Sequence, residues 1–120
     1  MNVLIIEDDK LTLTSLQFGL TQLGHTVYTA EGVEEAINVI VDNKIDVLLS
    51  DVMMSRISGL SLVAVLRSVY SYSIPIIMMS SLNNSSIQEE IFKAGANDFI
   101  PKPFTIDDLS QKLDKYIPGL

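Results

Sequence analysis

The sequence contains no cysteine and no tryptophan, and only one of its 120 residues is a histidine. The absence of cysteine excludes disulfide bonds, thiolate metal sites and a cysteine nucleophile. Basic residues are also scarce, with 8 Lys and Arg against 15 Asp and Glu, so the net charge is −7. Because such a surface repels phosphate backbones and no stripe of Lys or Arg offsets it, we expect this chain not to bind nucleic acid directly.

Long apolar runs are absent as well. No stretch approaches the roughly 18 residues that a membrane span needs, and the apolar N-terminal run stops at Glu7 without the basic region of a signal peptide. We therefore expect a cytoplasmic protein with no membrane contact. A hydrophobic content of 48% excludes disorder as the main state, and the length predicts one domain over residues 1–120.

Short β-rich runs alternate with helical patterns about five times. The runs are mostly apolar, as in parallel strands that are buried on both faces. They cover residues 3–6, 26–28, 47–49, 76–79 and 99–100. The helical stripes lie within 13–23, 33–41, 62–69, 87–94 and 106–116, and the last is expected to end at Pro118-Gly119. Because a (β/α)8 barrel needs about 250 residues, this alternation predicts an α/β fold with an open, doubly wound sheet.

Ligands of such sheets bind beyond the carboxyl ends of the strands. Acidic residues follow two of the predicted strands, as Glu7-Asp8-Asp9 and as Asp51. If the first and third strands are neighbours, Glu7, Asp8 and Asp51 converge, and crowded carboxylates raise one another's pKa unless a cation is present. Mg²⁺ takes oxygen ligands of this kind. The same acids could instead cap the next helix and remain in water.

Two further strand ends carry polar groups. Ser80 and Ser81 follow the fourth strand, where a hydroxyl could bond a phosphoryl oxygen or cap the next helix. Lys102 stands between Pro101 and Pro103, which restrict the backbone and aim the ammonium. The Lys102-Pro103 bond is a candidate cis peptide. The alternative is a rigid turn with a surface lysine.

Taken together, these residues resemble the receiver domain of bacterial two-component response regulators of the chemotaxis type. The resemblance covers essentially the whole chain. It is carried by residues 5–9, 49–54 with Gly59, 75–81, 94–96 and 99–104. It implies a single flavodoxin-like (βα)5 domain with a parallel five-stranded sheet in the order 2-1-3-4-5.

The resemblance assigns the acidic residues to a metal and phosphoryl site. Asp51 would be the phosphoacceptor and would also contact the metal. Asp8 would hold Mg²⁺, with Glu7 nearby or bridging through water, and the backbone carbonyl of Met53 would be a third protein ligand. Mn²⁺ is an alternative metal.

The resemblance also implies how the phosphoryl group is held and sensed. Lys102 would pair with it, Ser80 would bond one of its oxygens, and Phe99 would be the aromatic switch that turns inward with Ser80. Met53 and Leu82 occupy the two variable positions with which the family tunes hydrolysis. Since both are large and apolar, we hypothesise that they hinder the attacking water and prolong the phosphoryl-aspartate.

The sequence departs from the family pattern in the loop after Asp51. Ser55 replaces the usual proline, and Ser58 replaces the usual acid before Gly59. The resemblance therefore does not define the conformation of this loop.

The resemblance implies a signalling switch: a sensor histidine kinase or phosphotransfer protein phosphorylates Asp51, and affinity for an output partner changes. The chain would not be an enzyme beyond its own phosphorylation and slow autodephosphorylation. The face formed by the fourth helix, fifth strand and fifth helix is the family's usual surface for a homodimer or partner.

Three other interpretations remain open. A pseudo-receiver would keep the fold as an interaction module without phosphorylation. An aspartyl-phosphate phosphatase of the haloacid-dehalogenase type would need a second Asp where Met53 stands. A flavodoxin-like electron carrier would need a hydroxyl-rich first loop.

Overall fold

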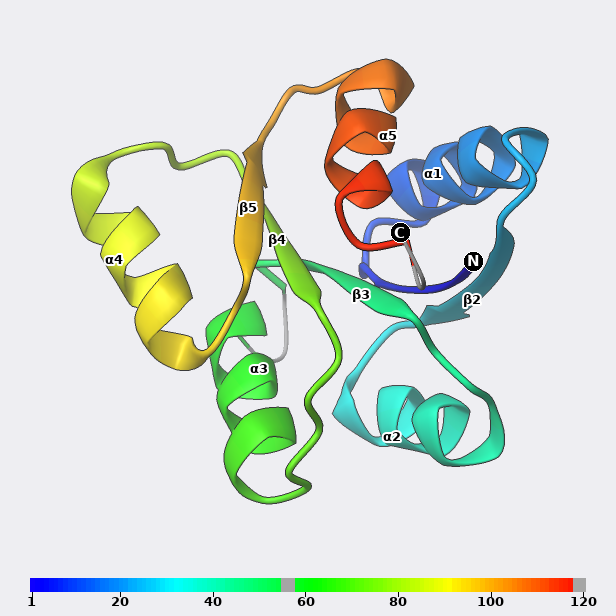
Figure 1. The fold of residues 1–120 in the computed structure, drawn as a ribbon. Helices are drawn as coiled ribbons and strands as arrows, with labels where there is room; N and C mark the ends of the chain where they lie inside the picture. Colours follow the sequence, from blue (N-terminus) through cyan, green and yellow to red (C-terminus); the bar gives the residue numbers. More distant parts are fainter. Residues whose placement is uncertain (55–57, 118–120) are drawn as a thin grey trace.

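The computed structural model describes residues 1–54 and 58–117, in which strands and helices alternate (Figure 1). The strands are β1 (Asn2–Ile6), β2 (Thr26–Ala30), β3 (Val47–Asp51), β4 (Ile76–Ser80) and β5 (Asp98–Pro101). The helices are α1 (Lys10–Gln22), α2 (Val33–Asp42), α3 (Gly59–Ser68), α4 (Ser85–Ala94) and α5 (Ile106–Asp114). The predicted alternation is confirmed, and each strand extends the apolar run that predicted it.

All strand pairs are parallel, and the sheet order is β2-β1-β3-β4-β5. This confirms the fold and the order that the resemblance implied. In the sheet Ile6 lies opposite Ser50, and Ser80 lies opposite Pro101. The strands therefore end nearly level, and the residues that follow them start from one edge of the sheet.

Two apolar cores lie on opposite faces of the sheet. Leu4, Ile6 and Leu48 point to one face, where they pack with residues of α2, α3 and α4. Val3 and Ile5 point to the other, where α1 and α5 cover the sheet (Figure 1). Every residue of β3 and β4 is buried, which explains their continuous apolar runs.

The helix ends follow local signals in the sequence. Thr105 caps α5 in a capping box with Asp108. Gly24 follows α1 and Gly95 follows α4 with φ of 93° and 115°, a left-handed conformation that favours glycine. Helix α5 ends at Asp114, two residues before the predicted stripe does, and the expected stop at Pro118-Gly119 lies outside the described residues. Within the described ranges no helix is long and apolar enough to span a membrane.

Candidate functional site

Three charged side chains from different strand ends meet at one point. The Lys102 ammonium donates to Asp51 Oδ2 at 2.9 Å and to Glu7 Oε1 at 3.3 Å. Glu7 follows β1 and Asp51 ends the neighbouring strand β3, whereas Lys102 follows β5 and its side chain extends past the end of β4 to reach Asp51. The Glu7 and Asp51 side chains are 1% and 11% exposed and that of Lys102 is 25% exposed, so the ion pairs are shielded from water and weakly screened.

Glu7 is the most perturbed acid of this group. Burial, a hydrogen bond to Asp51 that only the protonated carboxyl can make, and the charge of Asp51 raise its pKa to about 7, against the lowering effect of Lys102. Its Oε2 is buried and receives no hydrogen bond from the described residues. Because an unsatisfied carboxylate oxygen is costly to bury, this position favours a proton or a cation.

Lys102 is held charged by its two partners. Burial alone would lower its pKa, but the hydrogen bonds and charges of Asp51 and Glu7 outweigh burial and raise the pKa above its ordinary value. The backbone also fixes its place, because the Lys102 N–H donates to the Ser80 carbonyl at 2.7 Å. The Lys102-Pro103 peptide bond is cis.

The three consecutive acids after β1 have separate surroundings. Asp9 caps α1 and accepts from the N–H of Thr12 at 3.2 Å and from the Thr12 hydroxyl, which also lowers its pKa. The helix-capping interpretation is therefore right for Asp9, whereas Glu7 turns into the sheet edge. Asp8 is half-buried between them.

The predicted metal ligands do not form a three-carboxylate group in this structure. Among residues 1–54 and 58–117, no three His, Asp or Glu side chains are grouped as metal ligands. The ammonium of Lys102 lies between Glu7 and Asp51 instead, and supplies the positive charge that both carboxylates require. Mg²⁺ commonly takes only one or two carboxylates, with waters and phosphate oxygens completing its shell, so these oxygen donors fit the ion.

The hydroxyl of Ser80 is already engaged in the loop after β4. It donates to the Leu82 carbonyl at 2.8 Å and accepts from the Leu82 N–H at 3.0 Å, and Ser80 is fully buried. The N–H of Met53 donates to Asp51 Oδ1 at 3.2 Å. The residues Met53 and Leu82 are 62% and 45% exposed, so both large apolar residues lie at the solvent side of the site.

Phe99 lies on β5 against the helices that flank this strand. The ring of Phe92 on α4 meets it edge-on at a centroid distance of 6.2 Å, and the Lys112 ammonium lies 5.9 Å from its centroid. Lys112 in turn pairs with Asp98 at 2.9 Å. Burial alone would raise the pKa of Asp98, but the hydrogen bonds and charge of its partners, led by Lys112, lower it.

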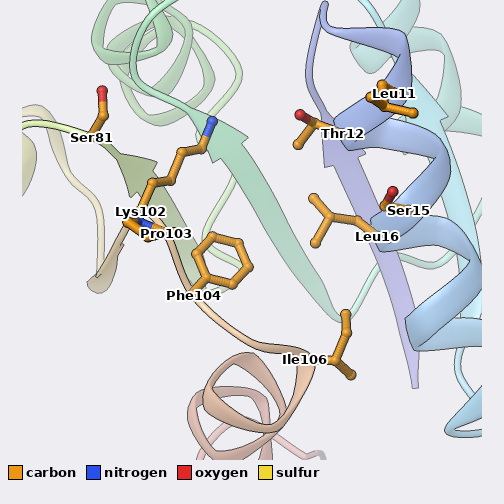
Figure 2. A pocket seen from close by; sticks show the side chains of 9 residues that line it. All are labelled: Leu11, Thr12, Ser15, Leu16, Ser81, Lys102, Pro103, Phe104 and Ile106. Atoms are coloured by element: carbon orange, nitrogen blue, oxygen red, sulfur yellow. The ribbon is translucent and has the colours of Figure 1, made fainter.

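A cavity of about 550 Å³ adjoins Lys102 between α1 and the loop from β5 to α5. Figure 2 shows Lys102 extending past Phe104 toward the end of β3, with Leu16 of α1 facing Phe104. Sequence reasoning did not identify this cavity, which is lined in part by Leu11, an apolar residue that is 78% exposed on α1.

The loop after Asp51 is partly described. Ser58 caps α3 by accepting from the Leu60 N–H at 3.1 Å, a role that the usual acid at this position could also fill. Ser55 lies outside the described residues.

Comparisons with known proteins agree with this fold. The family model of the response regulator receiver domain matches residues 3–114. The response regulator MprA of Mycobacterium avium (strain 104) is 33% identical over 113 residues, which cover 94% of this chain and 49% of that protein. The chain thus spans about half the length of the curated relatives it matches.

Solved structures are similar over nearly the whole chain. The chemotaxis protein CheY4 of Vibrio cholerae has a TM-score of 0.90 and 26% identity, covering 97% of this chain and 98% of its own. The receiver domain of Francisella response regulator 1452 has a TM-score of 0.87 and 30% identity, covering 96% of this chain and 94% of its own. The response regulator TrrA of Thermotoga maritima, solved in complex with Mg²⁺-BeF, has a TM-score of 0.83 and 25% identity, covering 97% of this chain and 98% of its own. The chain belongs to the response regulator receiver domain family of two-component systems.

Proposed function

We propose that this receiver domain is a phosphorylation switch of a phosphorelay, and that Asp51 is its phosphoacceptor. The chain would act in the cytoplasm, and a sensor histidine kinase or phosphotransfer protein would supply the phosphoryl group. The observation that carries the proposal is the hydrogen bond of 2.9 Å between the Lys102 ammonium and the nearly buried Asp51 carboxylate. A carboxylate that attacks a phosphoryl group needs a nearby cation for the negative charge that accumulates.

The oxygen atoms around Asp51 suit Mg²⁺, with Mn²⁺ as an alternative. Asp8, Asp51 and the backbone carbonyl of Met53 would hold the ion, with Glu7 nearby or bridging through water. The Oε2 atom of Glu7, which is buried and receives no hydrogen bond from residues 1–54 and 58–117, supports a cation here. When bound, the ion offsets the charge that the phosphoryl group brings to the carboxylates. The related TrrA of Thermotoga maritima was solved with Mg²⁺-BeF.

The chain's own residues orient the transfer. Met53 N–H holds Asp51 Oδ1, and Lys102 holds Oδ2. An Asp51 oxygen forms a bond to phosphorus while the bond from phosphorus to the donor's imidazole nitrogen breaks, and the electron pair of that bond leaves with the imidazole. Lys102 then pairs with a phosphoryl oxygen. Phosphoryl transfer depends mainly on such positioning and charge stabilisation.

The switch would begin at Ser80. Its single hydroxyl proton, now donated to Leu82, would be donated to a phosphoryl oxygen. The movement of Ser80 would make room for Phe99 to turn inward, which alters the face of α4, β5 and α5. We propose this face as the surface for an output partner or a homodimer, and we propose that Met53 and Leu82 slow the water that hydrolyses the phosphoryl-aspartate.

The alternative interpretations have less support. A pseudo-receiver does not need a lysine paired with a buried aspartate, and this chain has one. A phosphatase of the haloacid-dehalogenase type needs an acid at the position of Met53. We therefore propose no enzymatic turnover beyond self-phosphorylation and slow autodephosphorylation.

Intact-mass spectrometry after incubation with acetyl phosphate and Mg²⁺ tests the acceptor. We expect one phosphoryl group on the wild-type chain and none on Asp51→Asn or after removal of Mg²⁺ by a chelator. Asp9→Asn is the matched control, because it removes a neighbouring acid that caps α1, and it should be labelled like the wild type. Equal labelling of Asp51→Asn and the wild type would refute the assignment, and an unlabelled wild type would favour the pseudo-receiver.

A further inference from the structure

Gly59 begins α3 and is buried directly against the phosphoacceptor strand. A Cβ built on Gly59 would lie 2.0 Å from the backbone carbonyl oxygen of Asp51 and 2.9 Å from its carbon. Both distances are far below van der Waals contact. Because these are backbone atoms at the end of a fully buried strand, they cannot rotate away as a flexible side chain would.

Backbone conformation does not explain this glycine. The described glycines with a left-handed φ are Gly24 and Gly95, so Gly59 has a φ that other residues adopt. Close approach of two backbones therefore accounts for glycine at this position.

The backbone held by this contact also carries the acceptor carboxylate. The Gly59 N–H donates to the Val52 carbonyl at 2.8 Å, which ties the start of α3 to the residue after Asp51. The Ser50 hydroxyl donates to the Asp51 carbonyl at 3.2 Å. One residue further on, the Met53 N–H donates to Asp51 Oδ1. Displacement of the Asp51 carbonyl would rotate the peptide unit between Asp51 and Val52. The backbone that follows would then move the Met53 N–H away from the Asp51 carboxylate.

We propose that Gly59 is a positioning residue for phosphoryl transfer: its missing side chain lets α3 fix the Asp51 carbonyl, and thereby the direction of the Asp51 carboxylate. Ser50 supports the same carbonyl from within β3. This inference rests on the proposed function, and it assigns to Gly59 and Ser50 a part in the orientation of the acceptor.

Alanine at position 59 tests the inference against two matched glycines. A Cβ on Gly19 would lie 2.5 Å from Ile106 Cδ1, a side-chain atom on the α1 and α5 side of the sheet. Gly19→Ala therefore introduces a steric clash in the core at a place that does not involve Asp51. A Cβ on Gly32 meets nothing within 4 Å. The rate of labelling by acetyl phosphate is measured at saturating Mg²⁺ and donor, per folded molecule. We expect Gly59→Ala to lower this rate about 10- to 100-fold, as displaced reacting groups do, and both controls to stay within about twofold of the wild type.

The ¹⁹F spectrum of bound fluoroberyllate adds a readout that stability alone would not move. We expect Gly59→Ala to shift or lose the bound resonances, and Gly19→Ala to keep them even if it unfolds at a lower temperature. If Gly59→Ala does not fold, Ser50→Ala decides, because it deletes one hydroxyl and adds no atom. Loss of that neutral hydrogen bond should slow labelling about 3- to 10-fold.

The outcomes separate the two proposals. An unlabelled wild type overturns the proposed function, and this inference with it. A labelled wild type overturns the inference alone if folded Gly59→Ala reacts as fast as Gly19→Ala with unchanged ¹⁹F resonances. If Gly59→Ala does not fold, labelling of Ser50→Ala at the wild-type rate overturns it.

Discussion

Replacing Glu7 by glutamine should stabilise the metal-free chain above neutral pH and change little in acid. Glutamine keeps the shape and can still donate a hydrogen bond to Asp51, as the protonated carboxyl does, but it never ionises. Burial and the proximity of Asp51 raise the pKa of Glu7 from 4.5 to about 7. At about 1.4 kcal/mol for each tenfold change in proton affinity, the ionised carboxylate costs the folded state about 3 kcal/mol.

The sign of the pH dependence follows from which state holds the proton. Below pH 4.5 the folded and unfolded chains are both protonated at Glu7, and between 4.5 and about 7 only the folded chain is. The contribution of this group to stability is therefore complete in acid and is lost as the pH rises through about 7.

Urea unfolding followed by circular dichroism, with a chelator present, measures this difference. We expect the two unfolding free energies to agree at about pH 4, below the ordinary pKa of the carboxyl, and to differ by about 3 kcal/mol at about pH 8. Because each variant is compared with the wild type at the same pH, the contributions of the other titrating groups to the unfolding free energy cancel. Glu89→Gln on the exposed side of α4 is the control and should follow the wild type. A Glu7→Gln advantage that does not change with pH would mean that Glu7 titrates normally, and the reasoning on its burial would be wrong.

Three other substitutions test separate parts of the structure. Ser71 has a left-handed φ of 52°, so Ser71→Gly should stabilise the chain by up to about 1 kcal/mol, and a lower melting temperature would contradict this. Met53→Asn should shorten the life of the phosphoryl-aspartate by admitting water, as the decay of the phosphorylated mass would report; an unchanged decay rate refutes the role of Met53. Lys112→Ala removes the partner of Asp98 and the cation near Phe99 and should destabilise the chain by about 1 kcal/mol at neutral pH. Because Lys112 lowers the pKa of Asp98, this loss should shrink as the pH falls through that pKa, and a loss independent of pH would count against the ion pair.

The strands and helices were predictable because their apolar residues follow the periods of buried strands and one-sided helices. Thr105 was predictable as a cap because capping depends on neighbours along the chain. The same logic could have separated Asp9 from Glu7, since Thr12 stands three residues after Asp9 and bonds it. The convergence of the acids with Lys102 was expected from the strand ends, but it needed the strand order, which came from the family resemblance.

Contacts between distant residues could not be read from the sequence. The pKa of Glu7 is raised by its burial and by Asp51, which lies at the end of the neighbouring strand β3. The edge-on contact of Phe92 with Phe99 depends on how α4 lies against β5. The role of Gly59 depends on a separation between two backbones, and a single glycine in a sequence does not indicate which atom approaches it.

The Ser80 hydroxyl at the end of β4 can donate either to the Leu82 carbonyl in the loop that follows or to a phosphoryl oxygen, but not to both. A serine hydroxyl has a single proton to donate, and the Leu82 carbonyl holds it in this structure. If a phosphoryl oxygen takes that proton, the Leu82 carbonyl loses its donor and must turn to water. Since Leu82 is 45% exposed, the proposed phosphorylation would then change the surface of this loop as well as the buried site.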